Sequence, residues 1–303
     1  MKKTYHLCWS GGNGVLFRSH QDFVRGINCL CLAAHMTGSS ILAYAFMSNH
    51  VHICIRTESI NSFIQKFRYP YTRYFNAKYN RKGALGEKDF FCLEVNGLYH
   101  LLTVIAYILR NPMHHGVTST PFGYRYSSIR ALFRKDMGWE DNCDILPEKS
   151  KHLHLPSHHT LPPHIKMDKY GMTLPEYVID IADVEHQFST ARTFLYYMNR
   201  LTGEKWIAEQ EEDHTSLPPI TLQDIEKGVE YQDIRSMLVN EHGRANYSAP
   251  TDIEVCHKID KELLPQFGKK SIYELSDKEK SDTRQLLERG LHISAAQISR
   301  CME

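Results

Sequence analysis

Four short stretches rich in β-branched and aromatic residues predict strands in the first third of the chain. They lie at residues 4–9, 41–47, 51–56 and 90–95. Apolar runs of this length between Gly, Asn or Ser residues are typical of strands. The second and third stretches are joined at Ser48-Asn49, so we expect these two strands to pair in a hairpin-like arrangement.

Three longer stretches have the apolar spacing of helices. They lie at about residues 20–35, 61–79 and 98–109. Ser19 with Asp22 three residues later resembles a helix N-cap with an acidic partner, which predicts where the first helix begins. Proline disfavours helix for the residue before it, so Asn111-Pro112 is expected to stop the third. The element order predicts an α+β fold, a ferredoxin-like antiparallel sheet with helices.

The regular pattern dissolves between about residues 139 and 175. This stretch holds repeated prolines and a histidine cluster made of His152, His154, His158, His159 and His164. The histidines lack regular ligand spacing and accompanying cysteines, which favours a linker or irregular connection over a metal site. We predict an N-terminal domain over residues 1–137, this connection over 138–185, and a further domain over 186–303.

The C-terminal domain is expected to be mostly α-helical. The predicted helical stretches are residues 191–200, 221–240, 260–266 and 277–302. The last stretch resembles part of a helix-turn-helix, with a break after Gly290 and a helix start at Ser294. In that pattern a groove-reading helix would follow, or the helix from Ser294 would itself be the reader.

Charge divides the chain into two unlike parts. The formal net charge is +1, from 36 Lys and Arg against 35 Asp and Glu. Residues 1–135 hold 17 of the former and 5 of the latter, so this part carries +12 and the remainder −11. A basic half beside an acidic half indicates a polyanionic partner, foremost nucleic acid, for the basic one.

The cysteines and the length of the apolar runs indicate the cellular location of the protein. The eight cysteines are scattered without a C-x-x-C pair, which favours reduced thiols over a disulfide framework. No stretch approaches the roughly 18 apolar residues that a membrane span needs. We therefore expect no membrane partner and a cytoplasmic, nucleoid-associated location.

His50-Val51-His52 and Tyr107 with Asn111 are the candidate chemistry. Alternate side chains of a strand share a face, so His50 and His52 can bind one metal ion. Tyr107 and Asn111 stand one helical turn apart on one face. Two imidazoles, an amide oxygen and a phenol form a plausible phosphoryl-transfer site. The alternatives are packed histidines, a core tyrosine and an asparagine that caps a helix.

Several blocks in order resemble the HUH tyrosine transposases, the single-strand DNA transposases of insertion sequences, and most closely their REP-associated tyrosine transposase branch. The resemblance covers roughly residues 4–135. Its blocks are Tyr5-His6, residues 42–52, residues 71–76, residues 107–112 with Gly116-Val117, and residues 126–128. It departs at Gly86 and Asp89, where the family usually carries a Trp and an Arg, which predicts an altered part of the DNA contact surface.

The resemblance implies an enzyme and assigns roles to its residues. Tyr107 would be the nucleophile, and His50, His52 and Asn111 would hold a divalent metal, Mg²⁺ or Mn²⁺. The family attacks a phosphodiester of single-stranded, hairpin or palindromic DNA and forms a 5′-phosphotyrosine intermediate. Its members act as dimers or as monomers, so a homodimer stays open.

A basic and aromatic stretch over residues 59–86 contains no acidic residue. Cations with interleaved aromatics favour single-stranded or hairpin DNA. The DNA-binding candidates are Lys66, Arg68, Tyr69, Arg73, Tyr74, Lys78, Arg81 and Lys82. The alternative is a helix whose aromatics are its core face.

Two other functions remain open from the sequence. The first is a DNA-binding regulator of the same fold, domesticated and without cleavage. The second and weaker alternative is a rolling-circle replication initiator, which arranges a His pair and a Tyr in a similar way. Such initiators usually lack the Tyr-x-x-x-Asn-Pro block present at residues 107–112.

Overall fold

Four strands make one antiparallel sheet in the computed structural model, which describes residues 2–139, 143–199, 250–291 and 293–303. The strands are β1 (Lys3–Ser10), β2 (Ser40–Phe46), β3 (His50–Thr57) and β4 (Phe91–Val95), in the order β2-β3-β1-β4. All three pairings are antiparallel. The predicted α+β fold with a ferredoxin-like sheet is confirmed.

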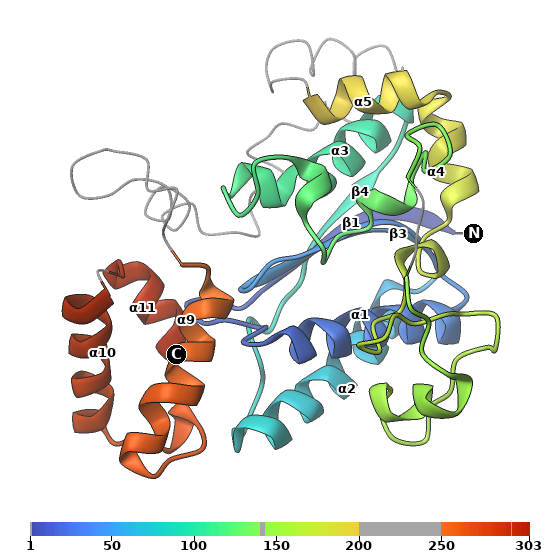
Figure 1. Ribbon diagram of the computed structural model, residues 1–303. Helices are drawn as coiled ribbons and strands as arrows, with labels where there is room; N and C mark the ends of the chain where they lie inside the picture. Colours follow the sequence, from blue (N-terminus) through green and yellow to red (C-terminus); the bar gives the residue numbers. More distant parts are fainter. Residues whose placement is uncertain (1, 140–142, 200–249, 292) are drawn as a thin grey trace.

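Helices cover both faces of this sheet (Figure 1). The helices α1 (His20–Thr37) and α2 (Ile60–Tyr79) lie on one face. The helices α3 (Leu98–His114), α4 (Ile181–Phe188) and α5 (Ala191–Asn199) lie on the other. The sheet therefore separates two layers, and a side chain's layer follows from its place in the strand alternation.

Aromatic residues at a spacing of four fix the inward face of α2. Phe63, Phe67, Tyr71, Phe75 and Tyr79 are all buried. Phe67 and Tyr71 meet the Trp9 ring edge to face, at centroid distances of 5.8 and 6.0 Å. The aromatics of this stretch are thus largely a core face, whereas none of its charged residues is buried.

Helix α3 continues one turn past the predicted stop. The sequence predicts its end at Asn111-Pro112, but the helix reaches His114 and closes at Gly116, whose φ is +67°. Proline removes only one backbone donor, and the apolar face of α3 packs along the sheet. Packing therefore outweighs the local preference of the residue before proline.

Residues 143–180 are irregular, as expected, but they pack firmly on α1. Short 3₁₀ turns occur at Glu148–His154 and Pro175–Tyr177. The buried Asn28 side chain holds the segment: its Nδ2 donates to the carbonyl oxygens of His154 at 3.0 Å and Gly171 at 2.8 Å. Its Oδ1 accepts from the Thr173 backbone N–H at 2.9 Å. The predicted connection is therefore an integral part of the N-terminal core.

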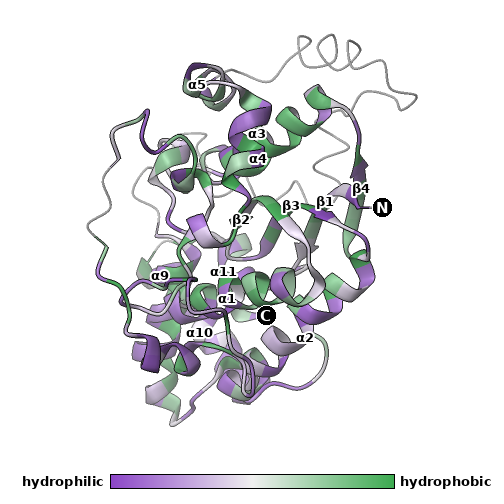
Figure 2. Cartoon of the chain, turned by 90° about the vertical axis from the view of Figure 1, so that its right-hand side faces the viewer, coloured by the Kyte–Doolittle hydropathy of each residue, from purple (hydrophilic) through white to green (hydrophobic). Residues whose placement is uncertain are grey.

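The described C-terminal part is helical, as predicted, and has its own apolar cluster. It comprises α9 (Asp252–Lys258), a π-helical turn (Ile259–Leu263), 3₁₀ turns (Leu264–Phe267 and Ile272–Glu274), α10 (Asp277–Leu291) and α11 (Ala295–Met302). Figure 2 shows α10 to be largely hydrophilic. Helix α9 was not predicted, although Thr251 and Glu254 form a capping box at its start. The helix predicted over 221–240 lies outside the described residues.

All eight cysteines are free. Within the described ranges, no helix combines the length and apolar character of a transmembrane span.

Buried charges join the C-terminal helices to the N-terminal domain. The Arg18 guanidinium, fully buried, donates to Asp260 at 2.8 Å and to the Cys301 carbonyl at 2.6 Å. Arg300 and Asp252 form a second buried pair at 2.8 Å, and the Ser48 hydroxyl donates to Asp252 at 2.6 Å. Ser48 lies in the turn before β3, so the C-terminal helices contact the turn next to His50.

We predict that Asp252→Ala destabilises the protein strongly, because it removes the carboxylate that pairs with the buried Arg300 guanidinium. The side chains of the pair are only 1% and 2% exposed. Breaking such a buried pair from one side costs about 3–5 kcal/mol. Chemical denaturation measures this loss. The matched control is Glu262→Ala, which breaks the exposed Lys258–Glu262 pair and should cost less than about 1 kcal/mol. Equal losses in the two variants would contradict the prediction.

Candidate active site

Strand alternation brings the predicted histidines to the face beneath α3. His50 pairs with Ser10 and His52 with Cys8, so both histidines point the same way. Helix α3 crosses this face and brings Tyr107 and Asn111 from its inward side. All four predicted catalytic and metal-binding residues therefore converge at one place.

The contacts among these residues are close. His50 Nε2 lies 3.0 Å from Asn111 Oδ1. The rings of His50 and His52 meet edge to face at 5.0 Å between centroids. The Tyr107 ring meets His52 edge to face at 5.3 Å. The phenol thus stands beside the histidine pair, one helical turn from the amide.

The site is deeply buried. His52 and Asn111 are fully buried, and Tyr107 is 5% exposed. Burial lowers the pKa of His50 to about 4, against the hydrogen bond with Asn111, which raises it. Burial also holds the pKa of His52 well below its usual range. Both imidazoles are therefore neutral at pH 7, the form in which histidine binds a metal.

The donor geometry suits a small divalent cation. Two ligands at right angles around Mg²⁺, with bonds of about 2.1 Å, stand about 3.0 Å apart. His50 Nε2 and Asn111 Oδ1 have this separation. His52 Nε2 is buried and has no hydrogen-bond partner among the described residues, so it is available as a third donor. No three His, Cys, Asp or Glu side chains group as a metal site in the described chain, and the predicted set differs from such a group because it consists of two imidazoles and an amide.

A third histidine, His6, belongs to this cluster, and no role was predicted for it. Its Nε2 lies 3.0 Å from His52 Nδ1, and the two rings stack at 5.1 Å. Burial lowers the pKa of His6 to about 3. A ring N–H shared between the two fixes the orientation and tautomer of His52. The alternation of side chains in β1 predicts on which face His6 lies. Its contact with His52 follows only once the register of β1 against β3 is known.

The DNA-binding candidates lie on the other layer, because α2 covers the sheet face opposite α3. Lys78 donates to the buried Asp22 at 2.6 Å, and Tyr74 donates to the same carboxylate at 3.1 Å. Arg81 lies over the Tyr273 ring, and Lys82 is exposed. Lys66, Tyr69, Arg73 and Tyr74 line one groove. The structure therefore does not bring these candidates to the Tyr107 site.

Arg68 has a structural partner in the loop where the sequence departs from the family pattern. Its guanidinium donates to the carbonyl oxygens of Lys88 at 2.6 Å and Leu85 at 3.0 Å. At Gly86, φ is +65°, and an added Cβ would come within 2.5 Å of the Ser10 carbonyl oxygen. The tight packing of this loop leaves no room for a tryptophan at that position.

Part of the chain is similar to a known protein family. Residues 2–111 match the family model described as "Transposase IS200 like". The comparison with curated proteins finds no match. Among solved structures, the chain is similar to one described as "Structure of the REP associates tyrosine transposase bound to a REP hairpin", at 13% identity and a TM-score of 0.38. That similarity covers 47% of this chain and 88% of the other. His50, His52, Tyr107 and Asn111 all lie within residues 2–111.

Proposed function

We propose, from the match of residues 2–111 to the IS200-like transposase family model, that the protein is a metal-dependent DNA endonuclease and strand transferase with a tyrosine nucleophile. The observation that carries the proposal is the convergence of His50, His52, Tyr107 and Asn111 beneath α3. A strand pair and a helix supply these groups from distant parts of the chain. The substrate is single-stranded or hairpin DNA.

In the proposed reaction the Tyr107 phenol oxygen attacks a phosphorus of the DNA backbone. The bond from Tyr107 to phosphorus forms while the bond from phosphorus to the 3′ oxygen breaks. The phenol loses one proton and the departing 3′ oxygen gains one, so that it leaves as a hydroxyl. The 5′ phosphate stays on Tyr107. The reverse reaction with another 3′-hydroxyl rejoins the strands, so no nucleotide cofactor is required.

His50, His52 and Asn111 would hold the divalent cation, Mg²⁺ or Mn²⁺. When bound, such a cation polarises a non-bridging phosphate oxygen and offsets the weak nucleophilicity of a phenol, whose ordinary pKa is near 10. His6 orients His52 from behind through the 3.0 Å contact between their ring nitrogens. The buried setting limits water around the reacting groups.

One observation favours a second candidate, a DNA-binding regulator of the same fold that does not cut. Tyr107 is only 5% exposed, so a phosphodiester reaches it only after α3 or its surroundings open. The two candidates separate in one experiment. The protein is mixed with labelled hairpin DNA and Mg²⁺ and resolved on a denaturing gel. A covalent band supports the enzyme, whereas DNA that binds without a covalent band supports the regulator.

We also propose that the chemistry resides in the N-terminal domain and that the acidic C-terminal domain governs target choice. All four candidate catalytic and metal-binding residues lie before residue 112. A chain ending at Asn199 keeps the packed segment 143–199, and we predict that it still forms the tyrosyl adduct on a generic hairpin, with higher non-specific affinity. The denaturing gel and a DNA titration measure these two quantities. A truncated chain that melts cooperatively but forms no adduct would place part of the active site in the C-terminal domain.

A further inference from the structure

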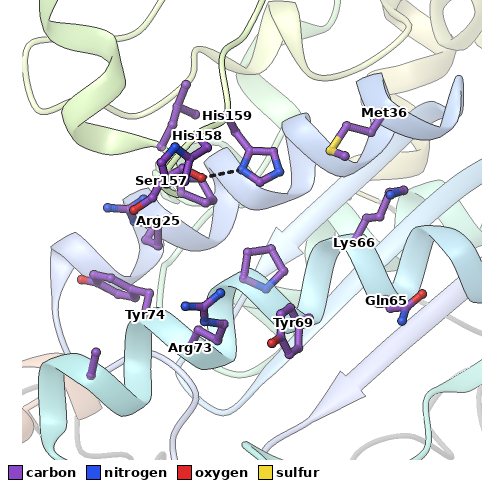
Figure 3. A pocket seen from close by; sticks show the side chains of 14 residues that line it. Arg25, Met36, Gln65, Lys66, Tyr69, Arg73, Tyr74, Ser157, His158 and His159 are labelled. Atoms are coloured by element: carbon purple, nitrogen blue, oxygen red, sulfur yellow. Dashed lines mark hydrogen bonds between the residues drawn. The ribbon is translucent and has the colours of Figure 1, made fainter.

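A groove lies on the α1 and α2 side of the sheet, away from Tyr107. Helices α1 and α2 form one wall, and residues 155–159 of the irregular segment form the other. The groove has a volume of ≈ 730 Å³. Figure 3 shows Arg25, Lys66, Tyr69, Arg73, His158 and His159 around it. Three separate parts of the chain therefore build this feature, including one beyond the residues that match the family model.

The chemistry of the lining is cationic and aromatic. Arg25, Lys66 and Arg73 contribute positive charge, and no carboxylate lines the groove. The Tyr69 side chain is 62% exposed, which is unusual for so large a ring. The Arg73 guanidinium lies over this ring at 5.8 Å, and the Arg25 guanidinium lies over Tyr74 at 4.9 Å.

Positions 66, 69 and 73 follow the helical spacing of three and four. Their side chains therefore share one face of α2, with the tyrosine ring between two cations. Alternation of phosphate-binding cations with a stacking ring suits single-stranded nucleic acid. An acidic peptide would pair with the cations but would not account for the exposed Tyr69 ring between them. The volume falls in the range of about 300–1,000 Å³ typical of ligand sites, enough for one or two nucleotides.

We propose that this groove binds a single-stranded DNA segment as a second site, separated by the sheet from the site of cleavage. The proposal rests on the proposed function, because it takes that segment to flank the phosphodiester attacked by Tyr107. The Tyr69 ring stacks on a base, and Lys66, Arg73 and Arg25 hold the adjoining phosphates. The strand then passes around an edge of the sheet between the two sites.

The test uses the full chain and a labelled oligothymidine, without divalent metal, in a series of salt concentrations. The double variant Lys66→Gln with Arg73→Gln should lower the slope of log affinity against log salt by about 1.4, because each phosphate that a cation neutralises adds about 0.7 to that slope. Tyr69→Ala should weaken binding about tenfold with little change in slope, because stacking carries no counterion release. The two variants thus separate charge from stacking.

The matched control is Arg130→Gln with Lys149→Gln, which removes one arginine and one lysine. Both side chains are exposed and lie outside the groove. This control should keep the wild-type slope. A double variant of Lys66→Gln with Arg73→Gln that has the same slope as the control would overturn the proposal. So would a polyglutamate peptide that binds the wild type as tightly as the oligonucleotide and loses affinity in the groove variant.

Measuring adduct formation as well as oligonucleotide affinity distinguishes a failure of this proposal from a failure of the proposed function. If the wild type forms no tyrosyl adduct but groove variants lose oligonucleotide affinity, the groove stands and the proposed catalysis fails. If the adduct forms and groove variants bind normally, the groove fails and catalysis stands.

Discussion

Tyr107→Phe should abolish the covalent adduct and strand cleavage while leaving affinity for hairpin DNA within about twofold. The change removes one oxygen atom and keeps the ring that packs against His52 at 5.3 Å. Removing the nucleophile of a serine protease, which also forms a covalent intermediate, costs on the order of 10⁶ in rate, so no adduct should be detectable here. The measurements are a denaturing gel with labelled DNA and Mg²⁺, and a titration of the same DNA without metal.

The control for this variant is Tyr69→Phe. Tyr69 is exposed and lies on the other layer of the molecule, so its hydroxyl is not expected to take part in cleavage. The control should form the adduct at the wild-type level. A covalent band that persists in Tyr107→Phe but disappears in Tyr69→Phe would move the nucleophile to α2. Tyr71 is a poor replacement, since its buried hydroxyl donates to the Leu16 carbonyl at 2.6 Å.

Local patterns in the sequence predicted much of the candidate site. The alternation in β3 placed His50 and His52 on one face, and the spacing of four in α3 placed Tyr107 above Asn111. Each inference needs only one element, because strand and helix periodicity act within a few residues. The antiparallel sheet with helices also followed from the order of the elements.

Features that depend on contacts between distant elements were not predictable in this way. His6 reaches His52 only through the register of β1 against β3, in which Cys8 pairs with His52. The packing of residues 143–180 depends on the buried amide of Asn28 in α1. Pattern and composition mark such a segment as irregular but do not reveal which groove it fills.

The side of the sheet on which α2 lies is the clearest example of a feature that depends on distant elements. The charge pattern predicts that its cations meet DNA, and it does not specify on which side of the sheet. Strands β1 and β2 run parallel, as do β3 and β4, and a right-handed crossover in each case places α1 and α2 on the same face. Once the strand order is known, the separation of α2 from the Tyr107 site follows.

His50→Ala and His52→Ala should each remove metal-dependent cleavage and weaken Mn²⁺ binding by more than about 100-fold. Each change deletes a neutral imidazole from the proposed donor set. Changes in the outer shell of a metal site cost only about 10–100-fold, so the loss of a direct ligand should exceed that. Asn111→Ala should cost less, because water can replace an amide oxygen. Calorimetric titration with Mn²⁺ measures affinity independently of cleavage.

His115→Ala is the matched control for the metal assignment. Its imidazole is also buried and lies 5.0 Å from the His50 ring, yet it is outside the proposed donor set. If proximity of a buried histidine were enough, this variant would lose Mn²⁺ affinity as the other two do. If His50, His52 and Asn111 are the ligands, it should bind Mn²⁺ within a few-fold of the wild type. Unchanged affinity in His50→Ala and His52→Ala would rule out the metal site, and the histidine pair would then act only in packing around Tyr107.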